Sequence, residues 1–195
     1  MTTAHTKYLT FEEYQAYDDG TDNRYELVDG ELVIEPKPTA DHSDVIDLLS
    51  DAISAELSRQ RLQWKVKRDV GVYTGMNPVT GKERSRTPDL CVVTQAQWAE
   101  LKADKTKSAV LRTPPLLAVE VVNPASKKTD YEAKEFEYKN VRVIEYWTVD
   151  FRNSKVAVRL LNDGLYSLKE FRGSERIISQ TFPELTLIAT QVLSA

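Results

Sequence analysis

An acidic side chain stands inside an apolar segment of this sequence. Six of the seven residues from Leu116 to Val122 are apolar, and the seventh is Glu120. The run is too short to cross a membrane and has prolines close to both ends, so it predicts a buried strand. An unpaired buried carboxylate is costly, so Glu120 must have a partner, carry a proton or hold a cation.

A second lone acid precedes another apolar run. Asp89 opens "PDLCVVT" and stands 31 residues before Glu120 (120 minus 89), with a helix-like connection between them. This spacing suits two neighbouring strands that bring the carboxylates together. Close carboxylates repel unless a proton or a divalent cation lies between them, and oxygen ligands favour Mg²⁺ or Mn²⁺ over zinc. Alternatively, Asp89 caps a turn and Glu120 pairs with a buried arginine or lysine.

A lysine follows the Glu120 strand on the next predicted helix. Lys134 stands 14 residues after Glu120 (134 minus 120) and shares a helix face with Tyr138 at i+4. Because this helix directly follows the strand, the ammonium could reach a phosphate oxygen or an attacking water beside a metal. The alternative is a surface pair with Glu137 or Asp130, as for most helix lysines.

Hydrophobic periodicity and turn residues predict roughly eight strands and four helices. Asp29-Gly30 favours a type I′ hairpin turn, and Asn162-Asp163-Gly164 marks a second hairpin near the C-terminus. The four main helices are expected at 11–18, at 41–60, as a short helix within 95–110 and at 131–140, and a short final helix follows near the C-terminus. The strand segments are expected at 24–36, 65–74, 88–94, 116–122, 143–150, 155–161, 165–171 and at an edge after 174. This order predicts an α/β (α+β) fold with a central mixed β-sheet flanked by helices and hairpins at both ends.

Composition narrows the class of protein. The chain has 195 residues, 41% of them hydrophobic, which predicts a single domain over 1–195. A net charge of -4 argues against a generally basic protein that coats nucleic acid. The lone cysteine, Cys91, excludes an intrachain disulfide and a cysteine zinc site. Neither a signal peptide nor a membrane-spanning segment is visible, so a cytoplasmic protein is expected.

Basic residues gather locally beside the predicted site. The groups are Lys65, Lys67 and Arg68; Lys82, Arg84 and Arg86; and Lys127 and Lys128. Such residues could contact phosphates and give salt-sensitive binding of nucleic acid. The alternative is that these are solvated loops. No motif for sequence-specific reading of bases is present.

Six motifs in order resemble one family of proteins. They are "RYELVDGEL" (24–32), "ADHSDV" (40–45), "RTPDLCVV" (86–93), "LAVEVVNPAS" (117–126), "YEAKEFEYKN" (131–140) and "EYWTVD" (145–150). The chain resembles the bacterial Uma-type restriction endonuclease family, a domain of unknown function in the PD-(D/E)XK nuclease superfamily. The superfamily motif has lysine two residues after the glutamate, where this chain has Val122, and Lys134 matches the position used by this branch.

The resemblance implies a restriction-endonuclease-like fold and a role for each matching residue. Asp89 and Glu120 would hold Mg²⁺ or Mn²⁺ with the backbone carbonyl of Val121, and Lys134 would assist the attacking water. Glu26 would be an additional acid from the first hairpin, unless it pairs with Arg24 or a neighbour. His42 would contact phosphate or cap its helix. Arg84, Arg86, Lys127 and Lys128 are the expected contacts to DNA.

Three functions fit these residues. The leading hypothesis is a metal-dependent endonuclease that hydrolyses DNA phosphodiester bonds, acting as a homodimer as the resemblance implies. The second is a catalytically silent module of the same fold that binds nucleic acid or regulates, motivated by Val122 and the net acidity. The third is an acid/base hydrolase of another substrate that uses Glu26 and Glu120, as paired carboxylates do in glycoside cleavage. The sequence has no row of aromatic residues that could stack on sugars, which argues against this function.

Overall fold

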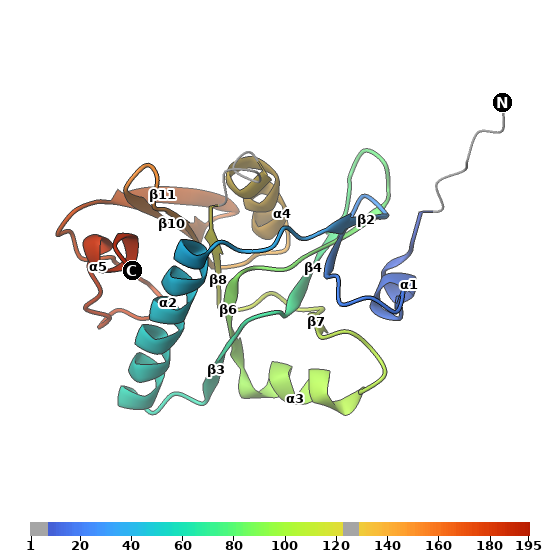
Figure 1. The fold of residues 1–195 in the computed structure, drawn as a ribbon, viewed down its shortest axis with the longest axis horizontal. Coiled ribbons are helices and arrows are strands. Elements are labelled where there is room, and N and C mark those ends of the chain that lie inside the picture. The colour runs from blue at the N-terminus through green and yellow to red at the C-terminus, as the bar shows by residue number, and fades with distance from the viewer. Residues whose placement is uncertain (1–7, 123–128) are drawn as a thin grey trace.

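Two β-sheets lie side by side, with helices covering their faces (Figure 1). The computed structural model describes residues 8–122 and 129–195. The helices are α1 (Phe11–Gln15), α2 (Ala40–Arg59), α3 (Gln95–Ala103), the π-helix η1 (Thr129–Ala133), α4 (Lys134–Asn140) and α5 (Ala189–Leu193). None of the described helices is long and apolar enough to cross a membrane.

Eleven strands are found in the described residues. They are β1 (Tyr25–Val28), β2 (Glu31–Ile34), β3 (Trp64–Lys67), β4 (Gly71–Met76), β5 (Glu83–Arg86), β6 (Leu90–Thr94), β7 (Val110–Leu111), β8 (Leu117–Val121), β9 (Glu145–Asp150), β10 (Lys155–Asn162) and β11 (Leu165–Phe171). The predicted mixed α/β class and both terminal hairpins, β1–β2 and β10–β11, are confirmed.

The larger sheet has six strands in the order β11-β10-β9-β8-β6-β3. β8 and β9 are parallel and the other neighbours are antiparallel, so the sheet is mixed. Its strands carry apolar residues on both faces. One face packs against α2 and α5 through residues such as Leu49 and Trp147, and the other packs against Tyr138 of α4. Burial on both faces explains why β8 is almost entirely apolar.

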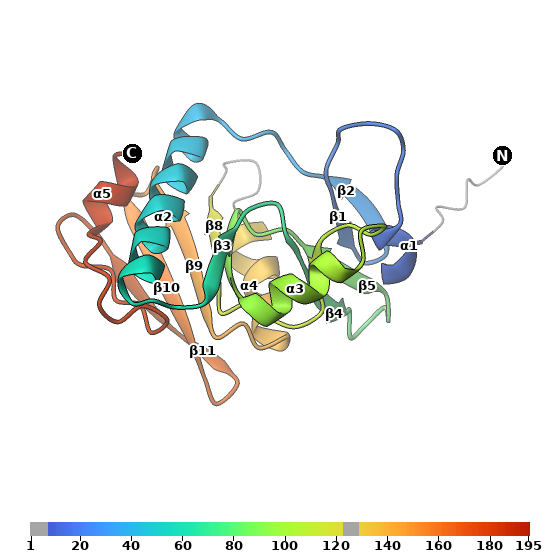
Figure 2. The ribbon, with the colours of Figure 1, turned by 90° about the horizontal axis from the view of Figure 1, so that it is seen from below.

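The smaller sheet has five strands in the order β2-β1-β5-β4-β7. It places the N-terminal hairpin next to the middle of the chain, because Leu27 of β1 pairs with Ser85 of β5. The helix α1 covers its outer side through Phe11, which is fully buried. Figure 2 shows this sheet and α1 at the opposite end of the molecule from α2 and α5.

Several predicted boundaries were wrong. The expected strand over 65–74 is two strands in different sheets, because the chain turns at Asp69, which has a positive φ of 57°. The predicted loop before Pro88 contains β5, whose Ser85 and Arg86 are buried. The side chain of Thr39, ahead of the expected Asp41, caps α2.

The C-terminal segment differs from the prediction as well. No strand of several residues forms among 172–188, where Arg176 and Ile188 make a single bridge. The segment is attached to the sheet through the buried carboxylate of Glu145, which accepts hydrogen bonds from Trp147 Nε1 at 2.7 Å and from the Thr181 backbone at 2.6 Å. The predicted short final helix is present as α5.

Candidate active site

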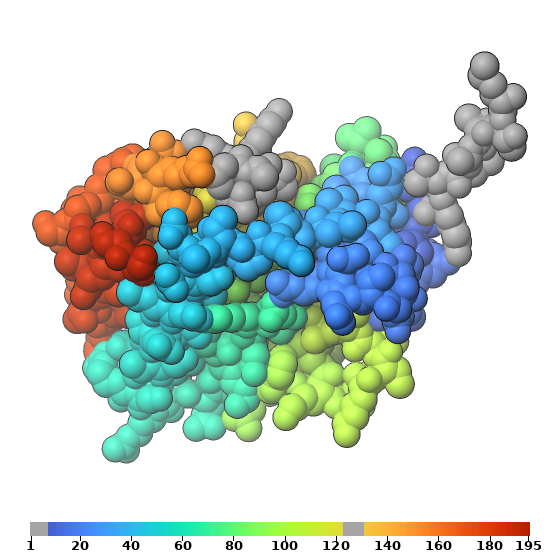
Figure 3. Space-filling view, in the orientation of Figure 1, coloured from blue at the N-terminus to red at the C-terminus, as the bar shows by residue number. Residues whose placement is uncertain are grey.

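A pocket of about 850 Å³ lies between the N-terminal hairpin, the start of α2, the start of β6 and the helix α4. Half of its polar lining residues were named as site residues from the sequence. The titratable residues that line it include Glu26, Glu35, His42, Arg86, Asp89, Glu120 and Lys134. The segment between β2 and α2, with Pro36 and Pro38, forms one wall and crosses the front of the molecule in blue (Figure 3).

Glu120 has polar partners inside the apolar strand. Its side chain is buried, Lys134 Nζ lies 2.9 Å from Oε2, and the Tyr138 hydroxyl donates to Oε1 at 2.8 Å. Lys134 is itself 8% exposed, so it is not a surface lysine. Both partners come from one face of α4, as their i, i+4 spacing predicts. Burial and the adjacent Glu120 carboxylate hold the pKa of Tyr138 well above its usual value, so the hydroxyl stays a donor.

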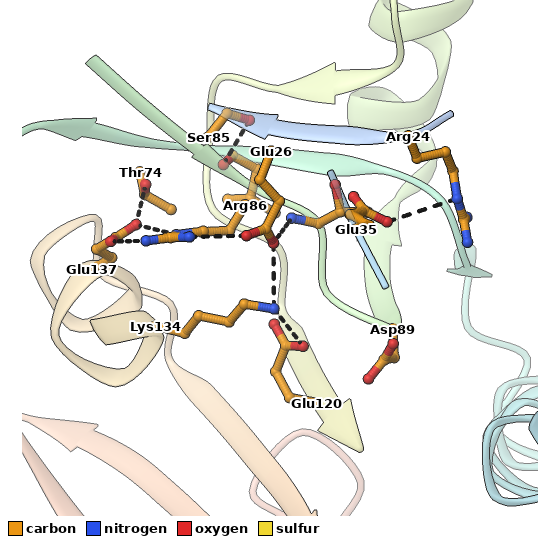
Figure 4. A network of polar contacts seen from close by, with 12 residues as sticks. Arg24, Glu26, Glu35, Thr74, Ser85, Arg86, Asp89, Glu120, Lys134 and Glu137 are labelled. Carbon is orange, nitrogen blue, oxygen red and sulfur yellow. Dashed lines mark hydrogen bonds and ion pairs between the residues drawn. The ribbon is translucent and has the colours of Figure 1, made fainter. Parts of the chain in front are cut away.

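Asp89 lies beside Glu120, immediately before the neighbouring strand β6. β6 and β8 are antiparallel with Leu90 opposite Val119, so one further residue places Asp89 level with Glu120. Both side chains line the pocket (Figure 4). Asp89 Oδ2 accepts the Val121 backbone N–H at 2.7 Å and lies 3.3 Å from His42 Nε2. The two acids are therefore brought together by sheet register, as their spacing suggested.

Glu26 joins the same group of side chains from β1. Its Oε1 lies 3.3 Å from Lys134 Nζ and accepts the Thr87 backbone N–H at 3.0 Å, while Oε2 accepts from Arg86 at 2.8 Å. Burial raises the pKa of Glu26, but Lys134 and Arg86 outweigh burial, so its pKa lies below the ordinary value. Figure 4 shows the Lys134 ammonium between the Glu26 and Glu120 carboxylates. The expected alternative partner, Arg24, instead contacts Glu35 and Asp69.

Arg86 is enclosed by carboxylates. Its guanidinium makes two hydrogen bonds to Glu137 of α4, at 2.8 and 2.6 Å, as well as the bond to Glu26. Thr74 also donates to Glu137, at 2.8 Å. Burial lowers the pKa of Arg86, but the two carboxylates outweigh it and raise that pKa above its usual range. With 4% exposure and these partners, Arg86 is placed to join α4 to β1 rather than to contact phosphate as predicted.

The other predicted nucleic-acid contacts differ in position. Arg84 pairs with Asp29 at the hairpin turn and does not line the pocket. His42 lies at the first turn of α2, where its backbone N–H is capped by Thr39 and its ring faces Asp89. Lys127 and Lys128 lie outside the described residues.

Three residues near the site were not given a functional role from the sequence. Tyr138 was named only as the residue at i+4 from Lys134, a spacing that placed it on the correct face. Glu137, at i+3 from Lys134, carried the same helical signal. Glu35 lines the pocket after β2, and burial raises its pKa above the ordinary value. No pattern in the sequence distinguishes Glu35 from an exposed hairpin acid.

The donor set suits a hydrated magnesium or manganese ion better than a fully enclosed one. Among the described residues, no three His, Cys, Asp or Glu side chains converge as a closed metal cage. Mg²⁺ commonly takes only one or two carboxylates and keeps several water ligands. Asp89 just before β6 and Glu120 on the adjacent strand β8, at the edge of a pocket that admits water, fit that requirement.

A model of one protein family matches residues 11–191, nearly the whole chain. Its description is "Uma2: Putative restriction endonuclease". The chain belongs to the Uma2 family. This confirms the family resemblance, and the Uma2 match includes every residue of the pocket discussed above.

A solved structure shows the same fold. It is a "putative nuclease belonging to DUF820" from Anabaena variabilis, with 16% sequence identity and a TM-score of 0.69. The match covers 89% of this chain and 92% of that one, so the shared fold extends over almost the full length of both proteins. No protein with a curated description matches the chain by sequence.

Proposed function

We propose that the chain is a Mg²⁺- or Mn²⁺-dependent endonuclease that hydrolyses DNA phosphodiester bonds in this pocket. The observation that carries the proposal is the position of Lys134, whose ammonium lies 2.9 Å from Glu120 and 3.3 Å from Glu26. In this proposal, Lys134 of α4 takes the role of the lysine that the superfamily places two residues after the glutamate. Family membership and the likeness to a protein described as a nuclease support the same reaction.

Asp89 and Glu120, with the Val121 carbonyl, are the residues proposed to hold the cation. A bound Mg²⁺ or Mn²⁺ would polarise the phosphoryl oxygen and lower the pKa of a water. Lys134 would orient the attacking water and offset the negative charge that develops on the phosphate. Glu26 would position Lys134 through its contact with the ammonium, on the side opposite Glu120. His42 would position Asp89 through the contact between its ring and the carboxylate.

A cleavage assay on the purified chain tests the proposal. With Mn²⁺ or Mg²⁺ the parent should cut duplex DNA, and Asp89→Asn should lose at least about 100-fold in rate, because one anionic ligand is removed. Glu31→Gln, at the exposed start of β2, is the matched control and should cut like the parent. Equal cleavage by Asp89→Asn and the parent would refute the assigned site.

A silent module remains the second candidate, and the ion pair between Lys134 and Glu120 is the observation that favours it. This pair satisfies a buried carboxylate without a metal. Titration calorimetry with Mn²⁺ separates the candidates. An endonuclease should show a site that Asp89→Asn removes, whereas a silent module should show none.

The proposal extends to the assembly and setting of the protein. The endonuclease would act on DNA as a homodimer, because two subunits can present two pockets to the two strands of a duplex. The cytoplasmic location expected from the sequence belongs to the same proposal.

A further inference from the structure

A group of lysines lies away from the pocket, on the edge strand β3, on the helix α3 and in the connection that follows α3. We call this the lysine surface, and its members are Lys65, Lys67, Lys102, Lys105 and Lys107. Three of them line a cavity of about 520 Å³ together with Trp98 and Asp104. Lys67 Nζ lies 3.9 Å from the centre of the Trp98 ring, which links β3 to α3. Figure 2 shows the two elements next to each other on the underside of the molecule.

The lysine surface has an excess of positive charge. Lys102, Lys105 and Lys107 line the cavity with one carboxylate, Asp104, which contacts Lys107 at 3.5 Å. Lys65 and Lys67 of β3 add two more positive charges, and α3 itself carries one acid, Glu100, so the five lysines outnumber the two acids. Burial together with Lys65 and Lys102 lowers the pKa of Lys67, so these like charges are close enough to repel. A chain with a net charge of -4 therefore carries a strongly cationic area whose charges destabilise one another. A polyanion would relieve that repulsion.

The lysine surface is connected to the pocket by β3. Lys67 ends this strand, and the next two residues, Arg68 and Asp69, line the pocket. A four-residue strand spans about 13 Å, which is within one turn of duplex DNA. β3 is also an edge of the six-stranded sheet, so no neighbouring strand covers its outer side in the described part of the chain.

From this placement we infer that the lysine surface is a second binding surface for the phosphate backbone of duplex DNA, beyond the pocket. The inference rests on the proposed function, because it assigns where the substrate extends. Exposed lysines would contact phosphates as point charges, with no reading of sequence. Lys102 and Lys105 are exposed and make no ion pair within the described residues, so they are available for this role.

Binding of a labelled 30-base-pair duplex, measured in EDTA at several salt concentrations, tests the inference without any cleavage. The variant Lys102→Gln/Lys105→Gln should bind roughly tenfold or more weakly at 0.1 M salt. The slope of log K against log salt should become less steep by about 2, because each lost phosphate contact contributes about 0.9. This variant leaves β3 and the pocket intact.

The matched control removes the same charge elsewhere. Arg152→Gln/Lys169→Gln alters two exposed residues at the far side of the same sheet, around β9–β11, and should bind within about twofold of the parent. Equal effects of the two double variants, or no effect of either, would overturn the inference. Binding of polyglutamate as tight as that of DNA at the same salt would overturn it too, because the surface would then accept any polyanion.

The two proposals fail differently. If the protein never cuts DNA but shows the expected salt dependence in EDTA, the lysine surface is supported and the nuclease assignment is refuted. If the protein cuts DNA but the two double variants bind the duplex equally well, the nuclease assignment is supported and the lysine surface is refuted.

Discussion

Lys134 occupies the position between two buried carboxylates where a cation is needed. Its ammonium contacts both Glu120 and Glu26, and Glu26 is paired with Arg86 as well. Any divalent ion that binds Glu120 must therefore share that carboxylate with a positive charge already in contact with it. At such short range, like charges at a partly buried site repel by several kcal/mol at most, so the lysine opposes binding of the ion.

Replacing Lys134 by methionine should separate binding from catalysis. Mn²⁺ should bind Lys134→Met at least about tenfold more tightly, because the competing charge is gone. Cleavage should fall by about 10²- to 10⁴-fold, because the water and the phosphate lose their cation. Calorimetry and a rate assay measure the two effects, with Lys139→Met on the same helix as the control. Weaker Mn²⁺ binding by Lys134→Met would contradict this competition.

Glu26 should make stability depend on pH in the acid range. Its pKa in the folded protein lies below the ordinary value of 4.5, despite the opposing effect of burial. Its stabilising contribution is therefore complete above about pH 4.5 and is lost as the pH falls through the lower, folded pKa. Urea unfolding between pH 6 and pH 3 should show a shallower loss of stability for Glu26→Gln than for the parent. Glu31→Gln, on the exposed side of the hairpin, should retain the steep loss.

At the scale of elements, α4 is positioned by its side chains. It follows the π-helix η1 and has no side chain capping its first turn. Instead, Glu137 bonds Arg86 of β5, and Tyr138 bonds Glu120 of β8. Two strands from different sheets therefore hold the helix that carries Lys134. Short π-helical segments are frequent at functional sites, which agrees with this placement.

Breaking this attachment should be costly. Glu137→Leu should lower the free energy of unfolding by about 3–5 kcal/mol, because Arg86 would remain buried with one of its two carboxylates missing. Chemical denaturation measures this loss. The control is Glu132→Gln, an exposed acid of η1, which should change stability by less than about 0.5 kcal/mol. A loss below about 1 kcal/mol for Glu137→Leu would show that α4 is held by its apolar contacts.

The sequence predicted which charged side chains line the pocket better than it predicted the boundaries of the elements. Asp89, Glu120 and Lys134 stood out because a charged residue beside a buried strand requires an explanation. β5 was missed because its residues, "ERSR", carry no apolar signal, and two of them are buried only through distant partners. The division of the strands into two sheets depends on non-local pairs such as Leu27 with Ser85, which local patterns do not encode.

At the scale of the molecule, the described chain presents one large pocket on one side. A duplex has two strands of opposite polarity, so two pockets related by a two-fold axis would match its symmetry. The sequence predicts such a homodimer through the family resemblance. The single-domain organisation over 1–195 likewise stays a prediction.

Light scattering during gel filtration measures the assembly. The expected mass is twice the 22.2 kDa of one chain. Addition of a duplex should increase the mass by one duplex per dimer. A mass equal to one chain at all protein concentrations would remove the dimer from the proposal.

The six-stranded sheet ends in β3 at one side, and this edge has a consequence for solubility. An open edge presents backbone groups that can pair with a strand from another molecule and start aggregation. Lys65 and Lys67 stand two residues apart on β3. Lysines on an edge strand commonly protect it against pairing with a strand from another molecule. The lysines of β3 that we propose to contact DNA would therefore also prevent unbound copies of the protein from pairing through this edge. A protein that lost them would be more prone to aggregate, even where DNA binding was no longer required.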